Sequence, residues 1–181
     1  PAAFVDDHPN QPALFGIPVE ASSHYDFSKP FRFVVAIGDS GIRAEKYALL
    51  IRRGGVPTTV IHPTAYVSMG AIVGPGSVIF SHAHLDPEVK IGGNSIINIA
   101  GVVGHETTIG EHSHVSGNAV IGGNCSIGNR VWVGLGASIR QGLTIGDDAF
   151  ISMGAIIVSD VPSNYKAISP HRKEALILPR H

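Results

Sequence analysis

An aliphatic residue recurs at every sixth position of the chain from Ile61 to Ile157, with no failed step. An α-helix cannot produce this period, because six residues span about 1.67 helical turns and would scatter the apolar positions around the axis. The residue two positions earlier is mostly small, and glycine often follows the aliphatic residue. Stacked coils with three flat sides of six residues account for this pattern and predict a parallel β-helix, with glycine or asparagine at corners where φ is positive. The aliphatic positions are Ile61, Val67, Val73, Ile79, Leu85, Ile91, Ile97, Val103, Ile109, Val115, Ile121, Ile127, Val133, Ile139, Ile145, Ile151 and Ile157.

The two ends of the chain lack this repeat, and the sequence predicts three regions: 1–58, 59–160 and 161–181. Within the first, segments 2–7 and 32–38 are predicted to be short strands. A helix is expected over 40–53, with Ser40 as its N-cap and Gly54-Gly55 as its end. This order predicts a small α/β subdomain of Rossmann-like type. Residues 161–181 contain prolines and are expected to cap the open end of the last coil.

Composition narrows the choice of partners. The net charge is −1 and charged residues make up 15% of the chain, so no global charge attracts nucleic acid or an anionic membrane. No apolar run approaches the roughly 18 residues that a membrane span needs. The chain opens at Pro1 with no signal-like segment, and its single cysteine, Cys125, falls at a small interior position. A cytoplasmic protein is expected.

Candidate chemistry gathers in one histidine-rich segment, residues 101–117. His105 follows an inward valine by two residues and His114 precedes another by one, so both side chains should point outward. They are separated by one and a half sides of a coil and emerge on different faces of one chain. If three prisms associate, His105 of one chain could approach His114 of the next. A histidine is a suitable base for an amine, and an adjacent carboxylate such as Glu106 could orient it. The alternative is that these are ordinary surface histidines.

The stretch HETTIGEHSHVSGNAVIGGNCSIG resembles the bacterial nucleotide-sugar N-acetyltransferases of the PglD/NeuD type, and the resemblance runs from about Val5 to Val161. It implies a left-handed parallel β-helix that assembles as a homotrimer. It also implies acetyl-CoA as the co-substrate, without a metal. The acceptor would be the amino group of a nucleotide-linked sugar, with a 4-amino-dideoxy sugar favoured.

The resemblance also implies roles for particular residues. His105 would be the general base and Glu106 its partner, while Asn98 would contact the sugar. His114, Ser116 and Gly123 would bind acetyl-CoA. The nucleotide-binding segments would include Asp6, Asp7, Gly38, Asp39 and Arg43, with Arg43 facing a phosphate.

One departure from the family concerns the N-terminal end. The family begins with a strand and a glycine-rich loop that cradles phosphate, and this sequence starts after that point. Either those residues are missing from the sequence, or nucleotide binding is weakened or rebuilt.

Three alternatives stay open. The first is a metalloenzyme of the γ-carbonic-anhydrase type, although the His-x4-His spacing of that family is absent. The second is a non-catalytic β-helix scaffold. The third is a hexapeptide acetyltransferase acting on serine, a drug or a free sugar. The uninterrupted hexads and the preceding α/β unit favour the sugar-nucleotide enzyme over the third.

Overall fold

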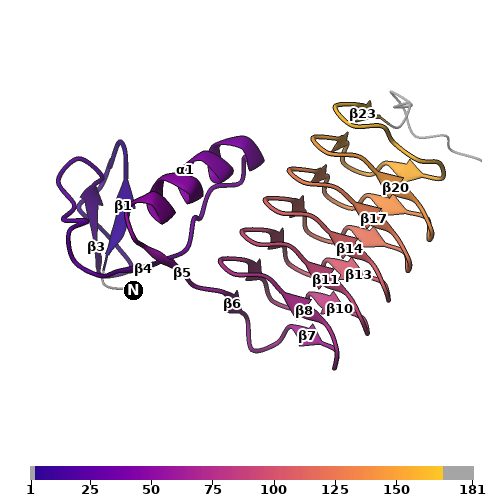
Figure 1. Ribbon diagram of the computed structural model, residues 1–181, viewed down its shortest axis with the longest axis horizontal. Helices are drawn as coiled ribbons and strands as arrows, with labels where there is room; N and C mark the ends of the chain where they lie inside the picture. Colours follow the sequence, from indigo (N-terminus) through magenta and orange to yellow (C-terminus); the bar gives the residue numbers. More distant parts are fainter. Residues whose placement is uncertain (1–2, 169–181) are drawn as a thin grey trace, which may run out of the picture.

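The computed structural model describes residues 3–168, and residues 1–2 and 169–181 lie outside the described part. An α/β unit at the N-terminal end leads into a prism of stacked coils (Figure 1). Every strand pair in the prism is parallel, so the predicted parallel β-helix and its mainly β character are confirmed. Between residues 3 and 168, no helix has both the length and the apolar character needed to cross a membrane.

Each turn of the prism contributes one two-residue strand to each of three sheets of seven, six and five strands. The seven-stranded sheet contains β6 (Val60–Ile61), β9 (Val78–Ile79), β12 (Ile96–Ile97), β15 (His114–Val115), β18 (Trp132–Val133), β21 (Phe150–Ile151) and β23 (Lys166–Ala167). The six-stranded sheet contains β7 (Tyr66–Val67), β10 (His84–Leu85), β13 (Val102–Val103), β16 (Val120–Ile121), β19 (Ser138–Ile139) and β22 (Ile156–Ile157). The five-stranded sheet contains β8 (Ile72–Val73), β11 (Lys90–Ile91), β14 (Thr108–Ile109), β17 (Ser126–Ile127) and β20 (Thr144–Ile145).

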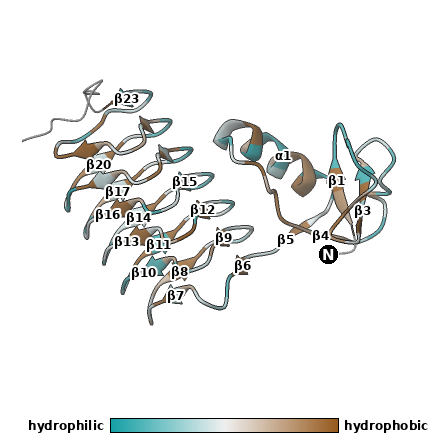
Figure 2. Ribbon diagram, turned by 180° about the vertical axis from the view of Figure 1, so that it is seen from behind, coloured by the Kyte–Doolittle hydropathy of each residue, from teal (hydrophilic) through white to brown (hydrophobic). Residues whose placement is uncertain are grey.

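The second residue of each strand points into the prism, as the six-residue period predicts. The buried core cluster runs from Ile79 to Val161 and includes Cys125, and most strands of the prism carry hydrophobic residues (Figure 2). The beginning of the prism differs, since Ile61 remains 45% exposed. Its strand β6 pairs with β9 alone and has no coil stacked on its other side. Burial therefore becomes complete only after the first coils.

Buried hydroxyl groups connect successive coils inside the prism. The Ser113 hydroxyl donates to the Gly128 carbonyl at 2.8 Å and accepts the Val131 N–H at 3.0 Å. Ser95 makes the equivalent pair of bonds one coil earlier, to the Gly110 carbonyl and from the Ser113 N–H. These small polar residues are tolerated in the core because each buried hydroxyl is satisfied.

The α/β unit contains two small sheets and one helix. β1 (Phe4–Asp6) pairs in parallel with β3 (Ile17–Ala21), which also pairs with β2 (Ala13–Leu14). β4 (Arg32–Phe33) pairs in parallel with β5 (Val56–Pro57). The strand predicted over 32–38 therefore forms only at its start, and residues 34–38 are irregular.

The helix α1 (Ser40–Arg52) forms where it was predicted, but its cap differs. The N-cap is Asp39 rather than Ser40, because an Asp39 carboxylate oxygen accepts the Ile42 N–H at 2.8 Å. Gly54, at φ 80°, follows the helix in the left-handed conformation. Ser40 is instead the first helical residue, and its hydroxyl accepts a bond from the Arg43 guanidinium.

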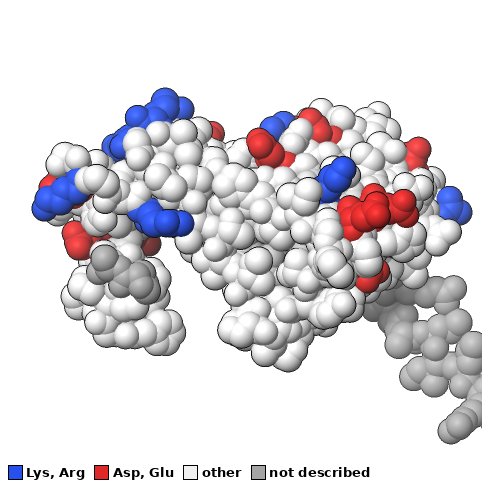
Figure 3. All heavy atoms as spheres, turned by 60° about the horizontal axis from the view of Figure 1, so that its bottom comes forward, with Lys and Arg blue, Asp and Glu red and all other residues white. Residues whose placement is uncertain are grey.

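The chain continues the prism beyond residue 160. Val161 forms a bridge with Ile145, and β23 pairs in parallel with β21. Residues 161–167 thus belong to the stacked coils, and the rest of the expected capping tail lies mostly outside the described residues. On the face shown in Figure 3, charged side chains form small groups of mixed sign rather than one extended patch.

Candidate active site

The coils sort the predicted site residues into columns along the prism, because stacked positions are separated by 18 residues. His105, Glu106 and Gly123 lie at the corner between the six-stranded and five-stranded sheets, which we call the His105 corner. Asn98 and Ser116 lie at the corner between the seven-stranded and six-stranded sheets, which we call the Asn98 corner. A single chain therefore presents these two groups at different corners.

At the His105 corner, an imidazole and a carboxylate form a pair. His105 Nδ1 lies 2.9 Å from Glu106 Oε2, and the two side chains are 60% and 59% exposed. The carboxylate accepts a hydrogen bond from Nδ1–H, so the proton stays on Nδ1 and Nε2 keeps a free lone pair. Glu106 adopts φ 58°, which turns the chain sharply beside the histidine. The pair has the arrangement of a general base with its orienting partner.

Gly123 lies one coil further along the same corner, beside the His105 ring. Its carbonyl accepts the Gly142 N–H at 2.9 Å, as the stacking requires. Among residues 3–168, no protein acceptor takes the Gly123 N–H. This corner therefore offers a base and a backbone donor close together.

His114 is buried against the irregular segment that precedes α1. Its Nδ1 lies 3.2 Å from the Gly38 carbonyl, and its Nε2 lies 3.4 Å from Asn98 Nδ2. The carbonyl requires a proton on Nδ1, so Nε2 accepts from the amide. The ring packs against Trp132 with 4.4 Å between ring centroids. Burial lowers the pKa of His114, and the neutral ring is the stable form here.

His114 lies on the outer side of its sheet, as the six-residue period predicts, but it is buried there because the Gly38 backbone covers it. The six-residue period could not predict this burial, because the segment that covers His114 is distant in sequence and lacks the repeat. Ser116, at the next position of the Asn98 corner, is also buried.

A groove of about 330 Å³ separates the irregular segment 34–38 from the seven-stranded sheet. Val78, Phe80 and Ile96 form part of its apolar lining on the prism side. Asn98 and His114 supply side-chain polar groups at the same groove. An apolar groove with a few polar groups is a typical small-molecule site.

The structure contradicts the expected phosphate contact of Arg43. This side chain is fully buried, and burial lowers its pKa to about 10. Its guanidinium donates to five backbone carbonyls from two parts of the molecule, so no donor is directed at a ligand. Arg43 is instead a structural link between α1 and the prism. The acceptor carbonyls belong to Ile37, Gly38, Asn94, His112 and Ser113.

The predicted nucleotide-binding carboxylates occupy the α/β unit. Asp7 pairs with Lys46 and accepts a 2.7 Å bond from the Ser22 hydroxyl, and the Lys46 contact is the main cause of its lowered pKa. Asp6 accepts the His8 N–H at 2.8 Å. Asp39 is engaged as the helix cap, and the Gly38 carbonyl serves both Arg43 and His114.

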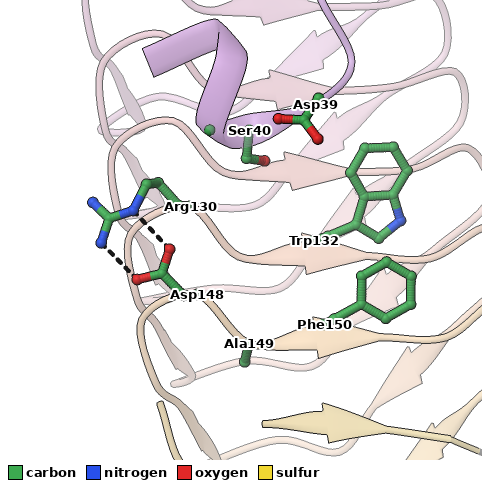
Figure 4. A pocket seen from close by; sticks show the side chains of 8 residues that line it. Asp39, Ser40, Arg130, Trp132, Asp148, Ala149 and Phe150 are labelled. Atoms are coloured by element: carbon green, nitrogen blue, oxygen red, sulfur yellow. Dashed lines mark hydrogen bonds and ion pairs between the residues drawn. The ribbon is translucent and has the colours of Figure 1, made fainter. Parts of the chain in front are cut away.

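A second pocket, of about 220 Å³, lies where α1 begins (Figure 4). Arg130 and Asp148 form a two-bond ion pair at 2.7 and 2.6 Å on one side of it. Trp132 and Phe150 present rings that are parallel within 7° on the other side. The 18-residue spacing of both pairs is the sequence signal that places their members on adjacent coils.

Among residues 3–168, no group of three or more His, Cys, Asp or Glu side chains is placed to hold a metal ion. His112, for example, packs against Tyr47 and bonds to the Asn94 amide at 2.8 Å.

Comparison with solved structures gives long matches over both parts of the chain. A mutant of perosamine N-acetyltransferase from Caulobacter crescentus, with histidine replaced by asparagine and in complex with CoA and GDP-perosamine, is 30% identical. The match covers 92% of this chain and 81% of that one, with a TM-score of 0.87. The acetyltransferase domain of PglB from Neisseria gonorrhoeae is 31% identical, with coverages of 91% and 82% and a TM-score of 0.85. WeeI from Acinetobacter baumannii is 28% identical, with coverages of 92% and 82% and a TM-score of 0.79.

A scan against family models and a search of curated proteins gave no match. The structural relatives nevertheless share the prism, the N-terminal unit and about 30% of aligned residues. The chain belongs to the hexapeptide-repeat nucleotide-sugar N-acetyltransferases.

Proposed function

We propose that this protein transfers the acetyl group of acetyl-CoA to the amino group of a nucleotide-linked amino sugar, with His105 as the general base. The observation that carries the proposal is the His105–Glu106 pair, which leaves Nε2 free beside the Gly123 N–H, for which residues 3–168 provide no acceptor. The relatives named above include a complex with CoA and GDP-perosamine. A 4-amino-dideoxy sugar is the favoured acceptor.

The chemistry requires a neutral amine. Its nitrogen forms a bond to the thioester carbonyl carbon, and the bond from that carbon to sulfur breaks. His105 Nε2 takes the proton released from nitrogen and returns it to the departing thiolate of CoA. The Gly123 N–H is suited to stabilise the carbonyl oxygen as it gains negative charge. Glu106 holds the imidazole in the tautomer that this sequence of proton transfers needs.

A homotrimer accounts for the separation of the two corners. The His105 corner of one chain would meet the Asn98 corner of its neighbour, so that each site draws on two chains. Apolar residues exposed around the Asn98 corner support this arrangement, because large apolar patches on a surface mark interfaces. They are Tyr66, Ile99, Val120, Leu135, Met153 and Ile156.

We assign acetyl-CoA to the space between neighbouring chains, where Gly123 would line one wall and the buried His114 and Ser116 would lie behind the surface of the other. The sugar would occupy the apolar groove, close to Asn98. The nucleotide would reach the α/β unit, where Asp6, Asp7 and Asp39 offer carboxylate oxygens and Gly38 offers backbone. We further propose that this unit is a Rossmann-like nucleotide-binding subdomain over 1–58. The prism over 59–160 would be the left-handed catalytic domain of a cytoplasmic protein.

Calorimetric titration with acetyl-CoA, followed by a thiol-release assay, tests the proposal. The assay uses UDP-, GDP- and dTDP-linked 4-amino sugars and compares wild type with His105→Ala. Both proteins should bind acetyl-CoA, and His105→Ala should lower kcat by about 10²- to 10⁴-fold, the usual contribution of a general base. Absence of acetyl-CoA binding to the wild-type protein would rule out the transferase.

A further inference from the structure

Most glycines at the corners of the prism are required by the main chain itself. A Cβ atom on Gly122 would lie 2.5 Å from the Gln141 nitrogen of the next coil, and one on Gly104 would lie 2.5 Å from the Gly123 nitrogen. Others, such as Gly136 at φ 63°, adopt a conformation that side chains disfavour. Close stacking or backbone conformation therefore explains these glycines.

Gly123 has neither explanation. Its φ lies outside the left-handed region. The three atoms nearest to a Cβ built on it all belong to the His105 ring: Nε2 at 2.5 Å, Cδ2 at 2.7 Å and Cε1 at 2.8 Å. The missing side chain is thus space that the imidazole occupies.

We infer that Gly123 is a positioning residue for His105, holding the imidazole flat against its Cα while Glu106 holds Nδ1. The inference rests on the proposed function and adds to it. His105 is 60% exposed within the chain, so these two contacts define where its ring lies. A ring fixed on both sides presents Nε2 in one direction, which a base needs for proton transfer.

An alanine at position 123 should displace the ring rather than the coil. The imidazole is the free end of an exposed side chain and can swing outward, whereas the main chain around Gly123 keeps its stacking bonds. Alanine also keeps the N–H that we assign to the acetyl group. The expected result is a lower kcat without loss of acetyl-CoA binding or of thermal stability. The adjacent Gly122→Ala substitution is the contrast, since its methyl group meets the Gln141 backbone and should lower Tm.

The test compares wild type, Gly123→Ala, Gly122→Ala, His105→Ala and the double variant at positions 105 and 123. For Gly123→Ala we expect kcat to fall on the order of 10-fold to 100-fold, a size consistent with a small misplacement of a catalytic group. Calorimetry should give an unchanged Kd for acetyl-CoA. In the His105→Ala background the second substitution should cause no further loss, because both act through one ring.

A side-chain ¹⁵N NMR spectrum provides a readout that does not need turnover. The His105 nitrogens should shift between wild type and Gly123→Ala as the ring leaves Glu106, and identical spectra would overturn the inference. So would a Gly123→Ala effect that persists at full size without His105, or a large loss of acetyl-CoA affinity. If wild type acetylates no amino sugar while the spectra still differ, the proposed function fails and the positioning stands.

Discussion

The imidazole of His114 meets the carbonyl of Gly38 at 3.2 Å, across 76 residues of sequence. This bond joins the irregular segment before α1 to the outer side of the seven-stranded sheet. On the other side of the ring, the Asn98 side-chain amide lies 3.4 Å from Nε2 of His114. A wall of the proposed acceptor site thus depends on the α/β unit being docked.

The burial of His114 predicts acid sensitivity of the fold. Burial lowers its pKa below the ordinary value of 6.5 in the folded state, and His112 is shifted in the same direction by the same main cause. The unfolded chain therefore binds more protons below about pH 6.5, and stability is lost as pH falls through the folded-state pKa. We expect Tm to drop between pH 7.5 and pH 5.5, and His114→Gln to reduce that drop. Differential scanning calorimetry across this range measures both, and slopes that coincide for the two proteins would contradict the prediction.

Because Arg43 is buried, replacing its guanidinium group should greatly lower the free energy of unfolding. Arg43→Lys leaves several carbonyls without a donor, since one ammonium cannot reach all of them. Each buried acceptor left unpaired costs about 1–3 kcal/mol. The control is Arg130→Lys, where the side chain forms an exposed ion pair with Asp148 whose worth is about 0–1 kcal/mol. Chemical denaturation should separate the two variants clearly, and equal losses would argue against a structural role for Arg43.

The proposed trimer interface beside the six-stranded sheet can be tested by placing a charge on that sheet. Val120→Glu places a carboxylate on its outer side, and we expect it to prevent the proposed trimer from forming and to lower acetylation. Thr108→Glu, at the equivalent outward position of the five-stranded sheet, is the matched control. Light scattering coupled to size exclusion gives the mass of each protein. A Val120→Glu variant that remains trimeric and fully active would place the interface elsewhere.

If Glu106 acts only through His105, replacing its carboxylate should lower kcat without changing the affinity for acetyl-CoA. Glu106→Gln retains the shape of the side chain but removes the charge that stabilises a protonated His105 ring. We expect kcat to fall by about 10-fold or more while the Kd for acetyl-CoA stays unchanged. Steady-state kinetics and calorimetry provide the two values. A change confined to the Kd would assign Glu106 to substrate binding instead.

The sequence predicts the prism well because its period is a local property that repeats in every coil. It also identifies the His105–Glu106 pair, since adjacent residues at a corner must be neighbours. The role of Arg43 could not be read in this way, because its partners are backbone carbonyls up to 70 residues away that any residue type would provide. His114 was placed on the correct side of its sheet, but the cover above it comes from a segment without a repeat. The N-cap was misjudged by one residue, since Asp39 and Ser40 are both good caps and only the backbone decides between them.

Because the coils stack in a constant register, the prism of this enzyme can become longer or shorter only by complete coils. Strand partners and hydroxyl bonds such as that from Val131 to Ser113 join positions 18 residues apart. Removing one residue would turn every later aliphatic side chain out of the core, whereas removing a full coil would bring equivalent positions back into contact. Coils that follow the one holding Gly123 can therefore be gained or lost as units. Such a change leaves His105 and Gly123 unmoved, while it lengthens or shortens the outer surface of the prism that is available to the proposed CoA site.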